Sequence, residues 1–148
     1  MYPMVLGAHN VLRWLVLALA ALALVMAYKG WFGKKEWQEG DRRYGVMLTG
    51  ALDLQFLLGI VLYFGLSPVT RTALSNMKAA MKEPSLRFFA VEHAFLMLVA
   101  VVLAHVGSVM VKKASNDAKF RTAAIWYTLS TLAILFAIPW WRPLMPGF

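Results

Sequence analysis

Four apolar runs dominate the sequence, and each is long enough to cross a lipid bilayer. They extend over about residues 5–28, 44–66, 88–111 and 122–140. A helix needs about 20 apolar residues to span the hydrocarbon core, where every backbone polar group must be hydrogen-bonded within the segment. Alternating apolar and polar stretches and Asn-Gly or Asp-Gly turns, which are typical of strands, are absent from the sequence. We therefore predict an all-α integral membrane protein, with a single transmembrane domain over 1–148 folded as a four-helix up-down bundle.

The composition agrees with this interpretation and excludes several kinds of site. Of the 148 residues, 61% are hydrophobic and 15% are charged, whereas a soluble chain is about 45–50% apolar and about 25% charged. The chain has no cysteine. Disulfides, thiolate zinc sites, iron–sulfur clusters, c-type haem attachment and a thiol nucleophile are therefore excluded.

The basic residues predict how the helices are oriented. The net charge is +8, and nine basic residues lie in the links 29–43 and 112–121, against four in the link 67–87. The positive-inside rule then places the first and third links in the cytoplasm of a bacterial cell, and both termini outside the inner membrane. Because these charges flank the apolar runs and no nucleic-acid-binding motif is present, we expect the lipid bilayer as the partner and no nucleic acid.

The second link has a helical pattern of its own. Leu74, Met77 and Met81 recur at helical spacing beside two lysines. The pattern predicts a short helix over about residues 72–82 that lies on the outer membrane surface. It serves either as a connector or as a lid over a site just below it.

Ionisable groups inside the predicted spans are the main candidates for function, because such groups are costly in a membrane. Gln55 accompanies them as a neutral polar residue. The six ionisable residues are His9, Arg13, Asp53, Glu92, His93 and His105.

His9 and His93 are predicted to lie at the same depth. With a rise of about 1.5 Å per residue, His9 lies about 6–8 Å below the outer end of the first span, and His93 about 8 Å below that of the third. Facing imidazoles on two helices of a bundle are what one haem b with two axial histidines requires. The alternative is that both histidines only form hydrogen bonds between helices.

The surroundings of the two histidines fit a haem. Arg13 and Arg87 are candidate partners of the haem propionates. For Arg13, an ion pair with Glu92 is an equally supported alternative. Phe89 and Met97 supply apolar surface, and Gly59 permits the close approach of a helix or a macrocycle.

His105 does not fit a second haem. It lies twelve residues after His93, which places it 120° around the helix, so we predict one haem per chain. Asp53 is at a similar depth on the second span, and the two residues are predicted to pair. The pair is either a buried hydrogen bond, a part of a proton path, or a quinone pocket. A zinc or di-iron centre is not expected, because clustered carboxylate and histidine ligands are missing.

The sequence resembles a group of small bacterial four-helix membrane proteins labelled cytochrome b or cytochrome b-like. The resemblance covers nearly the whole chain. It rests on the segments His9–Trp14, Leu54–Phe64, Arg87–His93 and Ile138–Trp140. The resemblance implies haem b and electron transfer.

One position departs from the pattern of that group. The residue before Leu54-Gln55 is often histidine there and is Asp53 here. If a histidine at this position is an axial ligand in the group, His105 on the facing helix is the alternative ligand in this chain.

These observations together predict an electron carrier rather than an independent enzyme. We expect one bis-histidine haem b near the outer face, with electrons passing between a quinol-linked complex and a redox partner. The chain is then a subunit of a respiratory complex or a homodimer. Two alternatives remain: a haem-free accessory subunit of a respiratory or photosynthetic complex, and a quinone-binding or proton-relay protein centred on Asp53 and His105.

Overall fold

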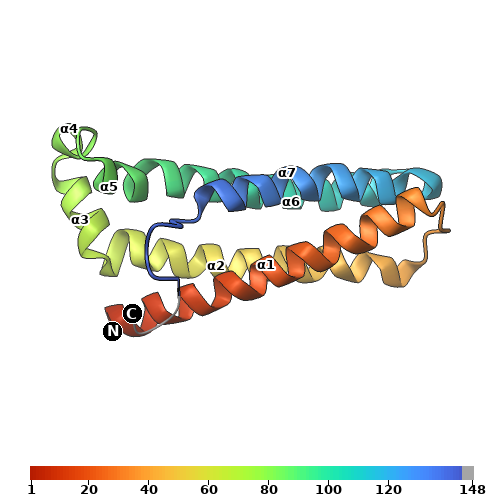
Figure 1. The fold of residues 1–148 in the computed structure, drawn as a ribbon, viewed down its shortest axis with the longest axis horizontal. Coiled ribbons are helices and arrows are strands. Elements are labelled where there is room, and N and C mark those ends of the chain that lie inside the picture. The colour runs from red at the N-terminus through yellow and green to blue at the C-terminus, as the bar shows by residue number, and fades with distance from the viewer. Residues whose placement is uncertain (145–148) are drawn as a thin grey trace.

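The computed structural model describes residues 1–144, and all of the regular structure in that part of the chain is helical. Figure 1 shows the four long helices side by side. The helices are α1 (Tyr2–Phe32), α2 (Arg43–Val61), α3 (Pro68–Ser75), α4 (Met77–Ala80), α5 (Pro84–Arg87), α6 (His93–Lys113) and α7 (Lys119–Ala137). Two π-helical turns, Leu62–Leu66 and Phe88–Glu92, extend α2 and precede α6.

Four helical segments are long and apolar enough to cross a membrane. They are Tyr2–Phe32, Glu39–Leu66, Pro84–Lys113 and Asn116–Ala137. The predicted membrane helices are thus confirmed, and the chain is a multi-pass membrane protein. The last helix ends at Ala137 and not at Trp140 as predicted, because Pro139 cannot donate a backbone hydrogen bond and clashes with a continuing helix.

The helices form two layers, as the predicted up-down bundle requires. Helices α1 and α2 make one layer, and α6 and α7 make the other (Figure 1). The layers meet where α1 packs on α7 and α2 packs on α6. The N-terminus, residues 138–144 and helices α3–α5 lie at one end of the bundle, which we call the terminus end; the links 33–42 and 114–118 lie at the other, the loop end.

Small residues allow the helices to pack closely at the centre of the bundle. Membrane helices associate through such close contacts, since lipid provides no hydrophobic driving force between them. Leu48 and Leu52 of α2 fill the space between the layers and are fully buried. The small buried residues include Ala20, Ala23 and Ala27 of α1, Ala100, Ala104 and Gly107 of α6, and Ala123 and Ala124 of α7.

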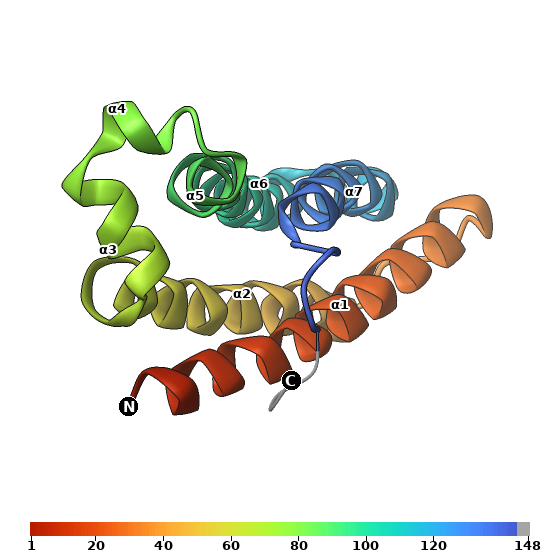
Figure 2. The same ribbon diagram turned by 60° about the vertical axis from the view of Figure 1, so that its left-hand side comes forward.

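The link between α2 and α6 is helical, but it is divided. Helix α3 begins after Ser67, whose side chain accepts a hydrogen bond from the Thr70 amide, and it ends at Asn76. Asn76 has φ −151°, ψ 83°, and its side chain starts α4. The structure therefore has two short helices where the sequence predicts one helix over 72–82. Figure 2 shows α3 and α4 bridging the ends of α2 and α5, so that they close one side of the terminus end.

Candidate functional site

A cavity of about 670 Å³ lies between the two layers at the terminus end of the bundle. Its walls come from the first turns of α1, the end of α2, α3, the start of α6 and the segment after α7. Cofactor and ligand sites are mostly apolar cavities of about 300–1,000 Å³ with a few polar groups, and this one fits that description. Both π-helical turns line it, and such turns occur often at functional sites.

His9 and His93 face each other in this cavity. Their ring centroids are 6.3 Å apart, and the ring planes are inclined at 72°. The predicted meeting of these residues is therefore confirmed, although their role as ligands stays a prediction. Two imidazoles on opposite sides of one metal have centroids about 6.3 Å apart, since each metal–nitrogen bond is about 2.0–2.1 Å and each nitrogen lies about 1.1 Å from its centroid. The observed centroid separation equals that value.

The orientation of His93 is fixed by the end of α7. Its Nδ1–H donates to the carbonyl oxygen of Ala137 at 2.7 Å. Because Nδ1 carries the proton, Nε2 of the neutral ring keeps its lone pair. A metal-binding histidine typically donates its other ring N–H in this way.

His9 has no comparable support for its ring. Its ring forms none of the hydrogen bonds found among residues 1–144, and its Nδ1 is buried. Leaving a buried polar atom unpaired costs about 1–3 kcal/mol. Gln55 instead donates from Nε2 to the backbone carbonyl of His9 at 3.0 Å, which fixes the helix and not the ring. Gly59 of α2 leaves space beside the ring, since a Cβ there would lie 3.5 Å from His9 Cε1.

Arg13 also lines the cavity, one turn below His9. Its guanidinium donates to the carbonyl of Leu144 and, at 3.5 Å, to Asn10 Oδ1. Its Nε is buried and has no partner within residues 1–144. The structure does not form the Arg13–Glu92 pair that the sequence allowed. Arg13 instead connects α1 to the segment that follows α7.

Glu92 pairs with Arg87. The Nε–H of Arg87 donates to Glu92 Oε1 at 2.9 Å, and both side chains are 40% exposed. The residues that line the cavity do not include Arg87 or Glu92. Arg87 is therefore less suited to a propionate than the sequence indicated.

Several cavity residues escaped the sequence analysis. Arg142 lines the cavity, and its guanidinium lies 5.1 Å from the ring centroid of Phe89. Its position between Pro139 and Pro143 gave no sign that this segment folds back over the cavity. Tyr63 was also missed, because a tyrosine near a span end is typical of the interface; its hydroxyl donates to the Ala90 carbonyl at 2.7 Å and joins α2 to α6. Phe89 and Met97 line the cavity as expected.

Asp53 and His105 do pair, but outside the cavity. His105 Nε2–H donates to Asp53 Oδ1 at 2.6 Å. The prediction of a pair is confirmed, whereas its burial is not, because the two side chains are 53% and 48% exposed. The two residues lie on adjoining helices at the outer surface of the bundle, where no layer of the protein covers them.

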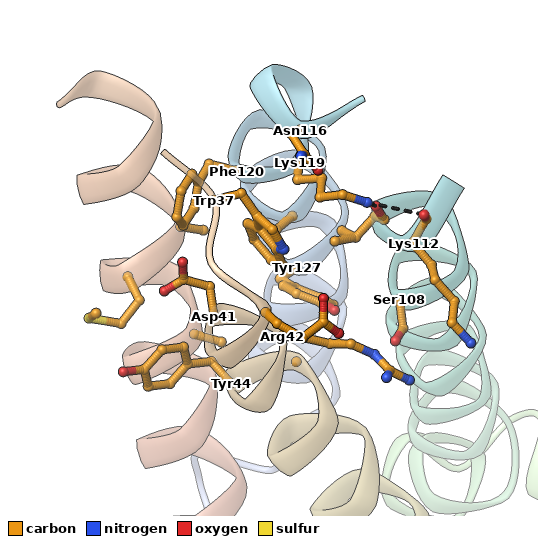
Figure 3. A pocket seen from close by; sticks show the side chains of 17 residues that line it. Trp37, Asp41, Arg42, Tyr44, Ser108, Lys112, Asn116, Lys119, Phe120 and Tyr127 are labelled. Carbon is orange, nitrogen blue, oxygen red and sulfur yellow. Dashed lines mark hydrogen bonds between the residues drawn. The ribbon is translucent and has the colours of Figure 1, made fainter. Parts of the chain in front are cut away.

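A second and smaller cavity of about 150 Å³ lies at the loop end (Figure 3). Lys119 enters it and donates from Nζ to the carbonyls of Val111 and Lys112, at 2.7 and 3.1 Å. These carbonyls belong to the last turn of α6, where helical carbonyls lack the usual partner four residues on; that of Val111 also accepts from the Ala114 amide at 3.3 Å. Lys119 thus serves as a cap for α6, and the cavity is a polar gap between the links rather than a candidate site.

Within residues 1–144, no group of three or more His, Cys, Asp and Glu side chains is placed to hold a metal ion. A site made wholly of protein ligands is therefore not found in that part of the chain. No protein-family model, curated protein sequence or solved structure matches the chain.

Proposed function

We propose that the protein is a membrane b-type cytochrome that holds one haem b between His9 and His93. The observation that carries this proposal is the 6.3 Å separation of the two imidazole centroids inside a cavity of about 670 Å³. Haem iron takes four ligands from the porphyrin and needs only two from the protein. Two histidines are therefore sufficient, even though a cluster of three ligands is not found among the described residues.

The residues of the cavity have the chemistry that a haem requires. Apolar side chains make up much of the wall, including Phe56, Phe89, Met97 and Ile134. The Nδ1–H of His93 is held by the Ala137 carbonyl, which leaves Nε2 available. The unpaired, buried ring of His9 gains a partner only if something in the cavity binds it.

Arg13 and Arg142 are the cations that we assign to the propionates. Both line the cavity, Arg13 from α1 and Arg142 from the segment that follows α7. A carboxylate in a site of low polarity is stabilised by a guanidinium, which donates two parallel hydrogen bonds. The Nε–H of Arg13, unpaired within residues 1–144, is one donor available for this purpose.

When bound, haem b supplies reversible one-electron chemistry, and with two histidine ligands its iron has no open position for a substrate. The protein's residues hold the cofactor and exclude water from it. We infer that the chain transfers electrons as a subunit or partner of a quinol-linked complex in a bacterial inner membrane. The terminus end, with its haem, faces the outside, since the loop end carries more basic residues.

The first test is a reduced-minus-oxidised spectrum of the detergent-purified protein, with a pyridine haemochrome to count haem. We expect a low-spin b-type signal near one haem per chain. His9→Ala and His93→Ala abolish that signal. His105→Ala is the matched control, because it removes the third and last histidine of the chain without touching the cavity.

Two outcomes contradict the proposal. One is a colourless protein from haem-replete cells, which leaves a haem-free subunit of a larger complex as the better interpretation. The other is a full low-spin signal in both His9→Ala and His93→Ala, which means that the ligands lie elsewhere.

A further inference from the structure

The Asp53–His105 pair lies near the middle of the membrane. Asp53 is ten residues from the start of α2 and His105 is eight residues from the end of α6, which places them about 15 Å and about 12 Å from the loop end of their helices at 1.5 Å per residue. The hydrocarbon core is about 30 Å thick. The pair is half-exposed, so in the isolated chain its polar atoms face lipid.

The hydrogen bond within the pair satisfies only half of its polar atoms. His105 Nε2 and Asp53 Oδ1 bind each other at 2.6 Å. The hydrogen bonds among residues 1–144 use neither His105 Nδ1 nor Asp53 Oδ2. Ionisable side chains within a membrane almost always face a protein interior or an aqueous cavity. The half-used pair therefore indicates a surface that another molecule covers.

We propose that the α2–α6 surface around Asp53 and His105 binds a second copy of this chain. As an imidazolium–carboxylate pair, in which both ring nitrogens of His105 are donors, it has one unused donor, at His105 Nδ1, and one unused acceptor, at Asp53 Oδ2, and it is therefore complementary to itself. In a two-fold dimer, residue i contacts residue j while j contacts i. His105 Nδ1–H of each copy then donates to Asp53 Oδ2 of the other, and both bonds form at the same depth.

The surface around the pair is suited to a close helix contact. Gly50 lies one turn from Asp53 on α2, is exposed, and has open space where its Cβ would be. Small residues of this kind let two membrane helices approach closely. Leu57 and Val102 flank the pair on the side of the terminus end and are 56% and 49% exposed. They provide apolar contacts around the polar centre.

A second copy fits these observations better than a small lipid-soluble molecule such as a quinone. Neither of the two cavities described above contains Asp53 or His105, and a small molecule needs a concave site. The proposal does not depend on haem, because the pair is separate from the histidines of the cavity.

The experiment uses cysteine cross-linking in native membranes, for which this chain is well suited because it has no cysteine. Two differently tagged copies are co-expressed, one with Leu57→Cys and the other with Val102→Cys. These positions lie one turn from Asp53 and His105, and they meet between copies in the proposed dimer. Oxidation is expected to produce a disulfide-linked dimer that carries both tags.

The matched control pair is Leu22→Cys with Leu129→Cys. These residues are 40% and 45% exposed, and each lies about 15 Å from the loop end of its helix, on α1 and on α7. They report random collisions at a similar depth in the membrane, since Val102 lies about 16 Å and Leu57 about 21 Å from the loop end of their helices. A cross-linked fraction for Leu57 and Val102 that is no higher than this control overturns the proposal.

A second variant tests the role of the polar pair itself. Asp53→Leu with His105→Leu removes both intermolecular bonds, and we expect dimerisation to weaken about tenfold or more. The exchanged variant, Asp53→His with His105→Asp, restores the cross-link because it restores the complementary groups. Unchanged helicity and thermal unfolding show that each variant is folded. Full cross-linking of the double leucine variant contradicts the proposal.

Discussion

The ring of His93 on α6 is held by the carbonyl of Ala137, the last residue of α7, at 2.7 Å. This carbonyl is free because the helix stops there, and the last four carbonyls of a helix have no partner within it. Pro139 causes the helix to stop. The end of one transmembrane helix thereby sets the orientation of a histidine on its neighbour.

Pro139→Ala is expected to loosen His93. Without the proline, α7 can continue, and the Ala137 carbonyl can bond within the helix instead of to the histidine. We expect weaker haem retention on gel filtration, with unchanged helicity. Pro143→Ala is the control, since Pro143 lines the same cavity but lies six residues after the end of α7. Equal haem loss in the two variants contradicts a role for the helix end.

A size series at Gly59 tests the packing of α2 against His9. A Cβ at this position lies 3.5 Å from His9 Cε1, which is an ordinary contact. Gly59→Ala is therefore expected to keep the fold and the haem signal. Gly59→Leu places further atoms where the ring lies, and overpacking costs about 1–3 kcal/mol. The haem content per chain and the thermal midpoint of both variants are the measurements, and a normal Gly59→Leu protein contradicts this packing.

Much of the fold was predictable, because the four spans and their order follow from length and hydropathy. The meeting of His9 and His93 was also predictable, since matched depth on neighbouring helices depends only on the helical rise. The exposure of Asp53 and His105 was not predictable, because the rotation of each helix is set by packing of small residues such as Ala104. The position of Arg142 was not predictable either, since it depends on how an irregular segment crosses the cavity.

Three arginine variants distinguish the residues that neutralise the propionates. Arg13→Gln and Arg142→Gln each remove a positive charge beside the proposed haem. The loss of this charge stabilises the oxidised haem relative to the reduced haem, so we expect the midpoint potential to fall. A shift of tens of millivolts is the scale of one charge at about 10 Å with an effective dielectric constant of about 20. Arg87→Gln is the control, since Arg87 pairs with Glu92. Spectroelectrochemical titration measures the potentials; a shift confined to Arg87→Gln contradicts the assignment.

Ser130 on α7 joins two helices inside the bundle. Its hydroxyl is fully buried and donates to the Ala100 carbonyl of α6 at 2.7 Å. Ser130→Ala is expected to reduce the free energy of unfolding by about 0.6 kcal/mol, and by no more than about 2 kcal/mol. Thr131→Ala is a matched control on the next residue, because Thr131 bonds to Tyr127 within its own helix. Equal effects of the two variants, measured by unfolding in mixed detergent, contradict the importance of the bond between helices.

Gly107 sets the spacing between α6 and α7. A Cβ at Gly107 would lie 2.5 Å from the Cβ of Trp126. That atom is attached directly to the backbone of α7, so the contact is relieved only if the helices move apart. Gly107→Ala is therefore expected to cost about 1–3 kcal/mol and to lower the thermal midpoint. Gly7→Ala is the control, because nothing lies within 4 Å of a Cβ at that position.

Since α6 carries His93 and α7 supplies the Ala137 carbonyl, Gly107→Ala is also expected to reduce haem retention. A protein with normal stability and normal haem content shows instead that α6 and α7 adapt without cost.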